Sequence, residues 1–97
     1  MSISKLTDLE HLRAVFDTAQ RVQQLEQGLR IVAEHHTGLA SHLRGQLADG
    51  VYNAPHSLIT RRGAEQLAAT HDALAADSTA MADTVRRALH PDLEEDR

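Results

Sequence analysis

An uninterrupted heptad pattern between Ala64 and Leu89 constrains the fold of this chain more than any other feature. One set of positions, the heptad series, advances by alternating steps of three and four residues: Ala64, Leu67, His71, Leu74, Ser78, Met81, Val85 and Ala88. This spacing keeps one stripe of an α-helix against a neighbouring helix. Beside it a second, mostly small set recurs every seven residues, where another backbone can come close: Ala68, Ala75, Ala82 and Leu89. The pattern predicts a helix that packs on another helix.

The first half of the chain carries a similar apolar pattern: Leu9, Leu12, Phe16, Ala19, Val22, Leu25, Leu29, Val32, His36, Leu39 and Leu43. Thr7 and Glu10 have the spacing of a capping box, so we expect the helix to begin at Thr7, after a loosely held arm. Glycines inside a helix cost about 1 kcal/mol each relative to alanine. We expect one continuous helix, because the series runs across Gly38. A break near Gly38 or Gly45 is the three-helix alternative.

The first helix is predicted to span residues 7–49. Gly50 follows the last periodic residues, and a glycine at that place is the usual left-handed helix cap. Residues 50–56 then form a connector, in which Pro55 favours an extended conformation for the residue before it.

The second helix is predicted to span residues 57–90, with Ser57 as its N-cap. Thr60 is the competing cap, but it would place two arginines in the first turn, where their charge opposes the helix dipole. Pro91 closes the helix. Residues 91–97 are predicted to form an acidic, disordered tail outside the single helical domain of residues 1–90.

A short connector between two long helices predicts an all-α, antiparallel, coiled-coil-like hairpin. In that hairpin His36 lies near His71, and the longer first helix extends past the second at its N-terminal end. The overhanging apolar residues Leu9, Leu12 and Phe16 then have no partner within the chain. They predict either a second chain or a refolded N-terminus, and we expect two hairpins to form a four-helix bundle.

Composition supports a thin core and excludes several classes of function. Apolar residues make up 41% of the 97 residues, yet the aromatic ones are Phe16 and Tyr52 alone. Thin alanine and leucine cores usually need a partner chain. The net charge of −4, mixed along both helices, argues against a nucleic-acid surface. With no apolar run long enough to span a membrane and no signal peptide, we expect a cytoplasmic protein, or one exported without a cleaved signal.

The histidines are the residues to test for chemistry. None of the seven has another histidine three or four residues away, so we predict no metal site and no cofactor. No nucleophile motif, phosphate-binding loop or paired-carboxylate cleft is present, so we predict no enzymatic activity. His36 and His71 both fall on the apolar series. They are either neutral histidines at the edge of the core or a pH-sensitive layer, in which protonation would place like charges together.

The tripeptide Leu43-Arg44-Gly45 lies ahead of the turn, where it resembles the W-x-G motif of the small W-x-G helical hairpins. These proteins are the type VII secretion substrates of actinobacteria and their relatives. Leucine replaces the tryptophan, and Tyr52 has His56 four residues later instead of the acid of that family's export signal. The resemblance implies a homodimeric or heterodimeric four-helix bundle with a secreted or chaperone-like role.

We therefore expect a protein–protein interaction module whose partner is a second copy or a homologous helical hairpin. The predicted interface consists of apolar side chains and one connector tyrosine: Leu9, Leu12, Phe16, Leu25, Leu74, Met81, Leu89 and Tyr52. Two alternatives stay open. One is a small nucleic-acid-associated regulator that uses the doublets Arg61-Arg62 and Arg86-Arg87. The other is a histidine-based bundle that binds a metal or a ligand.

Overall fold

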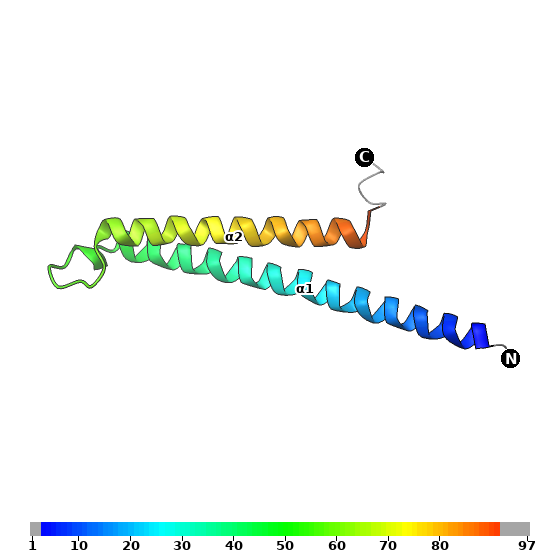
Figure 1. Cartoon of the computed structure of the whole chain (residues 1–97). Coiled ribbons are helices and arrows are strands. Elements are labelled where there is room, and N and C mark those ends of the chain that lie inside the picture. The colour runs from blue at the N-terminus through cyan, green and yellow to red at the C-terminus, as the bar shows by residue number, and fades with distance from the viewer. Residues whose placement is uncertain (1–2, 92–97) are drawn as a thin grey trace.

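The computed structural model describes residues 3–91, with side chains from Thr7 onward. Helix α1 spans Ile3–Ala48, a short 3₁₀ helix η1 spans Val51–Asn53, and helix α2 spans Arg61–Leu89. Figure 1 shows α1 and α2 side by side and antiparallel, joined by a loop at one end. The prediction of an all-helical, two-helix hairpin is confirmed for the described residues.

The hairpin is long and thin. Its extents are 79 × 32 × 14 Å, and its radius of gyration is 21.9 Å, against about 13 Å for a compact domain of about 100 residues. The N-terminal part of α1 continues past the end of α2 (Figure 1). The predicted overhang is therefore present, and Leu9, Leu12 and Phe16 on it are all exposed.

Helix α1 is continuous through all its glycines, as preferred from the sequence. A Cβ atom added at Gly28, Gly38 or Gly45 would meet nothing within 4 Å, so the structure gives no packing reason for these glycines. The start of α1 corrects the sequence prediction, because residues 3–6 are helical and no loose arm precedes Thr7 there. Residues 3–6 contain neither glycine nor proline, so nothing in them stops the helix from extending beyond the capping-box position.

The turn after α1 follows the prediction for Gly50. Its φ of 75° and ψ of 16° are left-handed, and its N–H donates to the carbonyl of Leu47 at 3.1 Å. Only glycine adopts this conformation without a steric cost, which explains why α1 ends here. Ala54, ahead of Pro55, is extended with φ −68° and ψ 139°, as the proline requires.

The predicted N-cap of α2 at Ser57 is wrong. Helix α2 begins at Arg61 with Thr60 as its cap, and the Thr60 Oγ1 accepts a hydrogen bond of 3.0 Å from the N–H of Gly63. The Ser57 hydroxyl donates instead to the carbonyl of Ile59 at 2.6 Å and so belongs to the connector. A cap contributes about 1 kcal/mol, more than the few tenths that a first-turn arginine costs near a helix N-terminus. The connector is correspondingly longer than predicted.

Helix α2 ends at Leu89, and the N–H of His90 closes its last turn on the carbonyl of Arg86 at 2.9 Å. Arg86 and Arg87 lie in that turn, where a positive charge complements the dipole. The predicted acidic tail beyond Pro91 lies outside the described residues.

The core between the helices is made of alanine. Within residues 7–91, the buried apolar residues form what we call the alanine series: Ala33, Ala40, Ala64, Ala68, Ala75 and Ala82. This reverses one expectation from the sequence. Apart from Ala64, the heptad series of α2 flanks the contact between α1 and α2 and does not form its centre, and its larger members Leu67, Leu74 and Met81 are 41%, 41% and 55% exposed. Small side chains at the centre of a helix contact allow a short distance between the axes.

Candidate interaction face

Four exposed apolar residues on the two helices come directly before a buried alanine. Val32 precedes Ala33 on α1, and Leu67, Leu74 and Met81 precede buried alanines on α2. One residue corresponds to about 100° of rotation around a helix, so these side chains lie beside the contact between the helices. Because the helices are antiparallel, the residue before the contact position points to the same side of the hairpin from both of them.

We call this side the apolar face. Its members follow steps of three and four on each helix: Leu25, Leu29, Val32, His36, Leu39 and Leu43 of α1, and Leu67, His71, Leu74, Ser78, Met81 and Val85 of α2. They are half-buried or exposed throughout, and none is Asp, Glu, Lys or Arg. The hairpin therefore presents one long, formally uncharged, largely apolar surface.

A histidine pair joins the two halves of the apolar face. The Nδ1 atoms of His36 and His71 are 2.9 Å apart, within hydrogen-bonding distance, and the rings stack with centroids 5.1 Å apart and an angle of 27°. The ring of His35 approaches His36 edge-on, with centroids 6.1 Å apart. The contact confirms the predicted proximity of His36 and His71, and it shows that the two apolar series share one side of the hairpin.

The opposite side, which we call the polar face, carries ion pairs between the helices. Arg30 bonds Glu26 on its own helix at 2.9 Å and Asp83 on α2 at 3.1 Å. Arg44 reaches Asp72 with both terminal nitrogens, and the Nη1–Oδ1 distance is 3.3 Å. This hydrogen-bonded guanidinium holds the pKa of Asp72 below its ordinary value. These pairs connect the two helices on the side opposite the apolar face.

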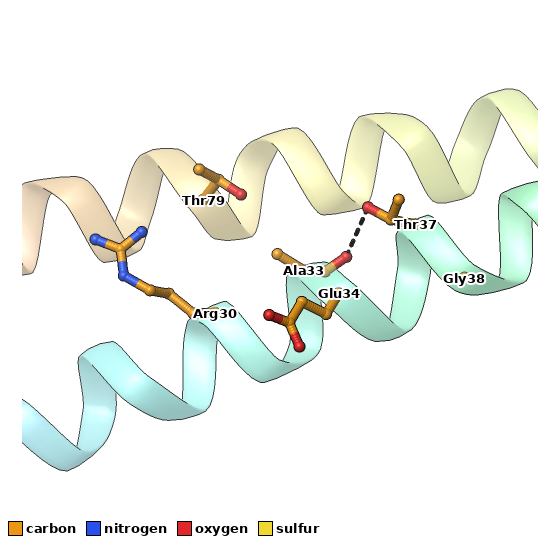
Figure 2. Close-up of a pocket in the computed structure, with 6 residues that line it drawn as sticks. All are labelled: Arg30, Ala33, Glu34, Thr37, Gly38 and Thr79. Atoms are coloured by element: carbon orange, nitrogen blue, oxygen red, sulfur yellow. Dashed lines mark hydrogen bonds between the residues drawn. The ribbon is translucent and has the colours of Figure 1, made fainter.

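A hollow of about 490 Å³ lies on the polar face (Figure 2). Arg30, Ala33, Glu34, Thr37 and Gly38 of α1 line it, with Thr79 of α2. Two of its polar groups already have partners: Arg30 is held by two carboxylates, and the Thr37 hydroxyl donates to the carbonyl of Ala33 at 3.0 Å. The hollow is an open groove in which these groups are not free to hold a ligand.

The residues predicted for the interface fall into four places. Leu25, Leu74 and Met81 are exposed on the apolar face, and three more are exposed on the overhang: Leu9, Leu12 and Phe16. Leu89 is half-buried at the end of α2. Tyr52 is half-buried in η1, and its hydroxyl donates to the side-chain oxygen of Gln46, so its polar end is used within the chain.

The sequence prediction missed several exposed apolar residues. Val15 continues the overhang and is 56% exposed, and Ile31 on the outer side of α1 is 65% exposed. Leu58 and Ile59 are exposed in the connector. Only Val15 had a usable signal, since it lies seven residues before Val22 of the apolar series. Ile31 fits no heptad position of the series and marks no continuous surface.

The described residues form no side-chain cluster that would support the metal-binding or the nucleic-acid-binding alternative. Among the described residues, no group of three or more His, Asp or Glu side chains gathers where it could hold a metal ion. Over the same part of the chain, no helix is long and apolar enough to cross a membrane. Arg61-Arg62 and Arg86-Arg87 lie at opposite ends of α2, and Arg61 pairs with Glu65 at 3.4 Å. The two doublets therefore do not combine into one basic patch.

Comparison with known proteins supplies no relative for this hairpin. No family model matches the chain, and neither a curated protein nor a solved structure matches it. In the structure Leu43-Arg44-Gly45 lies within α1, and the turn follows at Asp49 and Gly50. The likeness to the W-x-G hairpins therefore rests on this tripeptide and on the two-helix architecture.

Proposed function

We propose that this chain is a protein–protein interaction module whose apolar face binds a second copy, so that two hairpins form a four-helix bundle. One observation carries the proposal: the hairpin buries only alanines in its described core and leaves most of its large apolar side chains exposed. The proposed role is non-enzymatic, and the apolar face provides binding area and no catalytic group.

The energetics of the isolated hairpin favour a partner. Burying a leucine, valine or methionine fully contributes about 1.5–3 kcal/mol, and an alanine buries far less area. The hairpin therefore gains little from its own core, while Leu67, Leu74 and Met81 remain in contact with water. Contiguous exposed apolar surface of this kind marks interaction sites on soluble proteins. Covering the face would supply the stabilisation that the alanine core lacks.

A second copy suits the apolar face because the face is complementary to itself. A twofold interface places the same patch of both chains together. Charged patches would repel their own copy, but the apolar face has no Asp, Glu, Lys or Arg among its members. Helix α2 of 29 residues gives the face a length of roughly 43 Å, and two adjacent helices a width of about 20 Å. Its projected area is thus about 850 Å², close to the roughly 800 Å² per partner of a standard stable interface.

The resemblance to the W-x-G hairpins supports the same architecture. Its family forms four-helix bundles from two hairpins, either identical or homologous, and we extend that arrangement to this chain. A homologous hairpin with a similar uncharged face would occupy the same surface. A role in type VII secretion, as a substrate or a chaperone, is the wider proposal that this resemblance adds.

The test is the molar mass of the full chain measured by light scattering behind size exclusion over a dilution series. We expect the wild-type chain to be a helical dimer and Leu74→Glu/Met81→Glu, which places charges on the apolar face, to be a helical monomer. Ile31→Glu is the matched control, because it makes the same change at an exposed apolar residue off the face, and it should remain dimeric. A well-folded wild-type monomer at all concentrations would contradict the proposal, as would a control that dissociates like the face variant.

A further inference from the structure

The hydrogen-bonded histidines lie in the middle of the apolar face, between residues that are apolar on both helices. His36 follows Val32 and precedes Leu39 in the series of α1, and His71 lies between Leu67 and Leu74 in that of α2. We propose that the His36–His71 pair makes self-association through this face depend on pH, so that the dimer forms at neutral pH and dissociates on acidification. This inference rests on the proposed function, since it describes the regulation of the same surface.

The Nδ1–Nδ1 contact limits how many protons the pair can hold. At 2.9 Å one nitrogen must carry the proton and the other must offer its lone pair. Two neutral imidazoles satisfy this requirement, and so does one imidazolium beside one neutral ring. Two imidazolium rings carry a proton on every nitrogen, so both Nδ1 atoms become donors and the hydrogen bond is lost. The two positive charges then repel each other, and the stacked rings must separate.

The groups around the pair do not neutralise the second charge. On α1 the nearest titratable ring is His35, which would itself add positive charge. On α2 the neighbouring carboxylate is Asp72, which interacts electrostatically with His71, but both of its oxygens are already bonded to Arg44 of α1 and the one carboxylate faces two rings. The symmetric partner presents the same face, so it brings only its own histidine pair. Within the described residues, the pair therefore has an apolar surrounding and no unpaired carboxylate beside it.

Association makes the second proton harder to accommodate. In the hairpin alone His36 and His71 are half-buried, so a charged ring keeps part of its hydration. A second copy on the apolar face removes that water, and the charged form is disfavoured where it cannot be solvated. The dissociated hairpins then bind more protons than the dimer. Acidification consequently favours dissociation, and each additional proton taken up changes the dissociation constant about tenfold per pH unit.

Sedimentation velocity of the full chain at about pH 7.5 and about pH 5, across the range in which imidazoles titrate, tests the inference. EDTA is included to prevent metal ions from bridging the histidines. We expect the wild-type dimer to weaken about tenfold or more at the lower pH. His36→Leu/His71→Leu should form a dimer of equal strength at both pH values. His42→Gln, which removes a histidine outside the apolar face, should keep the wild-type response.

The outcomes separate this inference from the proposed function. A wild-type monomer at neutral pH overturns both. A wild-type dimer of equal strength at both pH values overturns the inference but not the proposed function. A double variant whose dimer dissociates at low pH like that of the wild type has the same meaning. The single variants His36→Leu and His71→Leu each remove the conflict between two imidazolium rings but keep one ring on the face, so their dimers should weaken less on acidification than the wild-type dimer. They provide the test should the double variant not fold, and a response as large as that of the wild type would overturn the inference.

Discussion

Single residues decide where the helices of this hairpin stop. Helix α1 contains glycines and Gly50 lies two residues after its end, and among the described residues only Gly50 has a positive φ. A Cβ atom at Gly50 would also lie 3.2 Å from the side-chain nitrogen of Asn53, whereas at Gly38 it would meet nothing. The same residue type therefore has opposite consequences at the two positions.

Replacing these glycines by alanine should change stability in opposite directions. Gly50→Ala forces a left-handed conformation on a residue with a Cβ atom and should lower the free energy of unfolding by about 1–2 kcal/mol. Gly38→Ala removes helix-disfavouring backbone entropy and should raise it by about 1 kcal/mol. Urea unfolding followed by circular dichroism at one fixed protein concentration measures both. An unchanged or raised free energy of unfolding for Gly50→Ala would show that the turn does not depend on the conformation of Gly50.

The ion pair between Arg44 and Asp72 is the residue-scale source of pH dependence on the polar face. The hydrogen-bonded guanidinium lowers the pKa of Asp72 in the folded chain, so the pair stabilises the fold above the ordinary aspartate range. That contribution is lost as the pH falls from about 4 through the lowered pKa. In Arg44→Gln the carboxyl of Asp72 should titrate at a higher pH than in the wild type, as followed by NMR. An unchanged titration would mean that the pair does not persist in solution.

At the scale of the elements, the sequence predicts the two helices, the turn at Gly50 and the contact between His36 and His71. It does not predict which stripe of α2 touches α1. The heptad series and the alanines next to it both repeat every seven residues. Periodicity therefore shows that both stripes lie toward a neighbouring helix, but not which of the two is buried more deeply. The order depends on α1, where Ala33 and Ala40 supply small residues opposite the alanines of α2. The helix contact chosen is therefore the one between the smallest side chains.

The cap of α2 is a second place where the sequence is ambiguous, since Ser57 and Thr60 have equivalent chemistry. Thr60→Ala removes the acceptor for the N–H of Gly63 and should lower the free energy of unfolding by about 1 kcal/mol. Ser57→Ala removes only a connector hydrogen bond to Ile59 and should cost less. Thermal or urea unfolding of the two variants under identical conditions compares them directly. A larger loss at Ser57 would contradict the cap assignment.

At the scale of the whole molecule, the hairpin has two faces of different composition. The polar face holds the interhelical ion pairs, and the apolar face gathers large side chains around the histidine pair. The overhang adds further exposed apolar residues beyond the end of α2. The sequence predicts an apolar overhang from the unmatched lengths of the helices. It does not predict which side of the hairpin is the apolar face, because the position of that face follows only from the alanine contact.

Protection of the apolar face in solution tests the central claim most directly. Ser78 lies on the apolar face, the adjacent Thr79 lines the groove of the polar face, and the chain contains no cysteine of its own. The alkylation rates of the thiols introduced by Ser78→Cys and Thr79→Cys are compared at increasing protein concentration. We predict that the thiol at position 78 becomes slower to react as the dimer forms, while the thiol at position 79 keeps its rate. Equal rates at every concentration, or slowing at position 79 alone, would contradict a bundle formed through the apolar face.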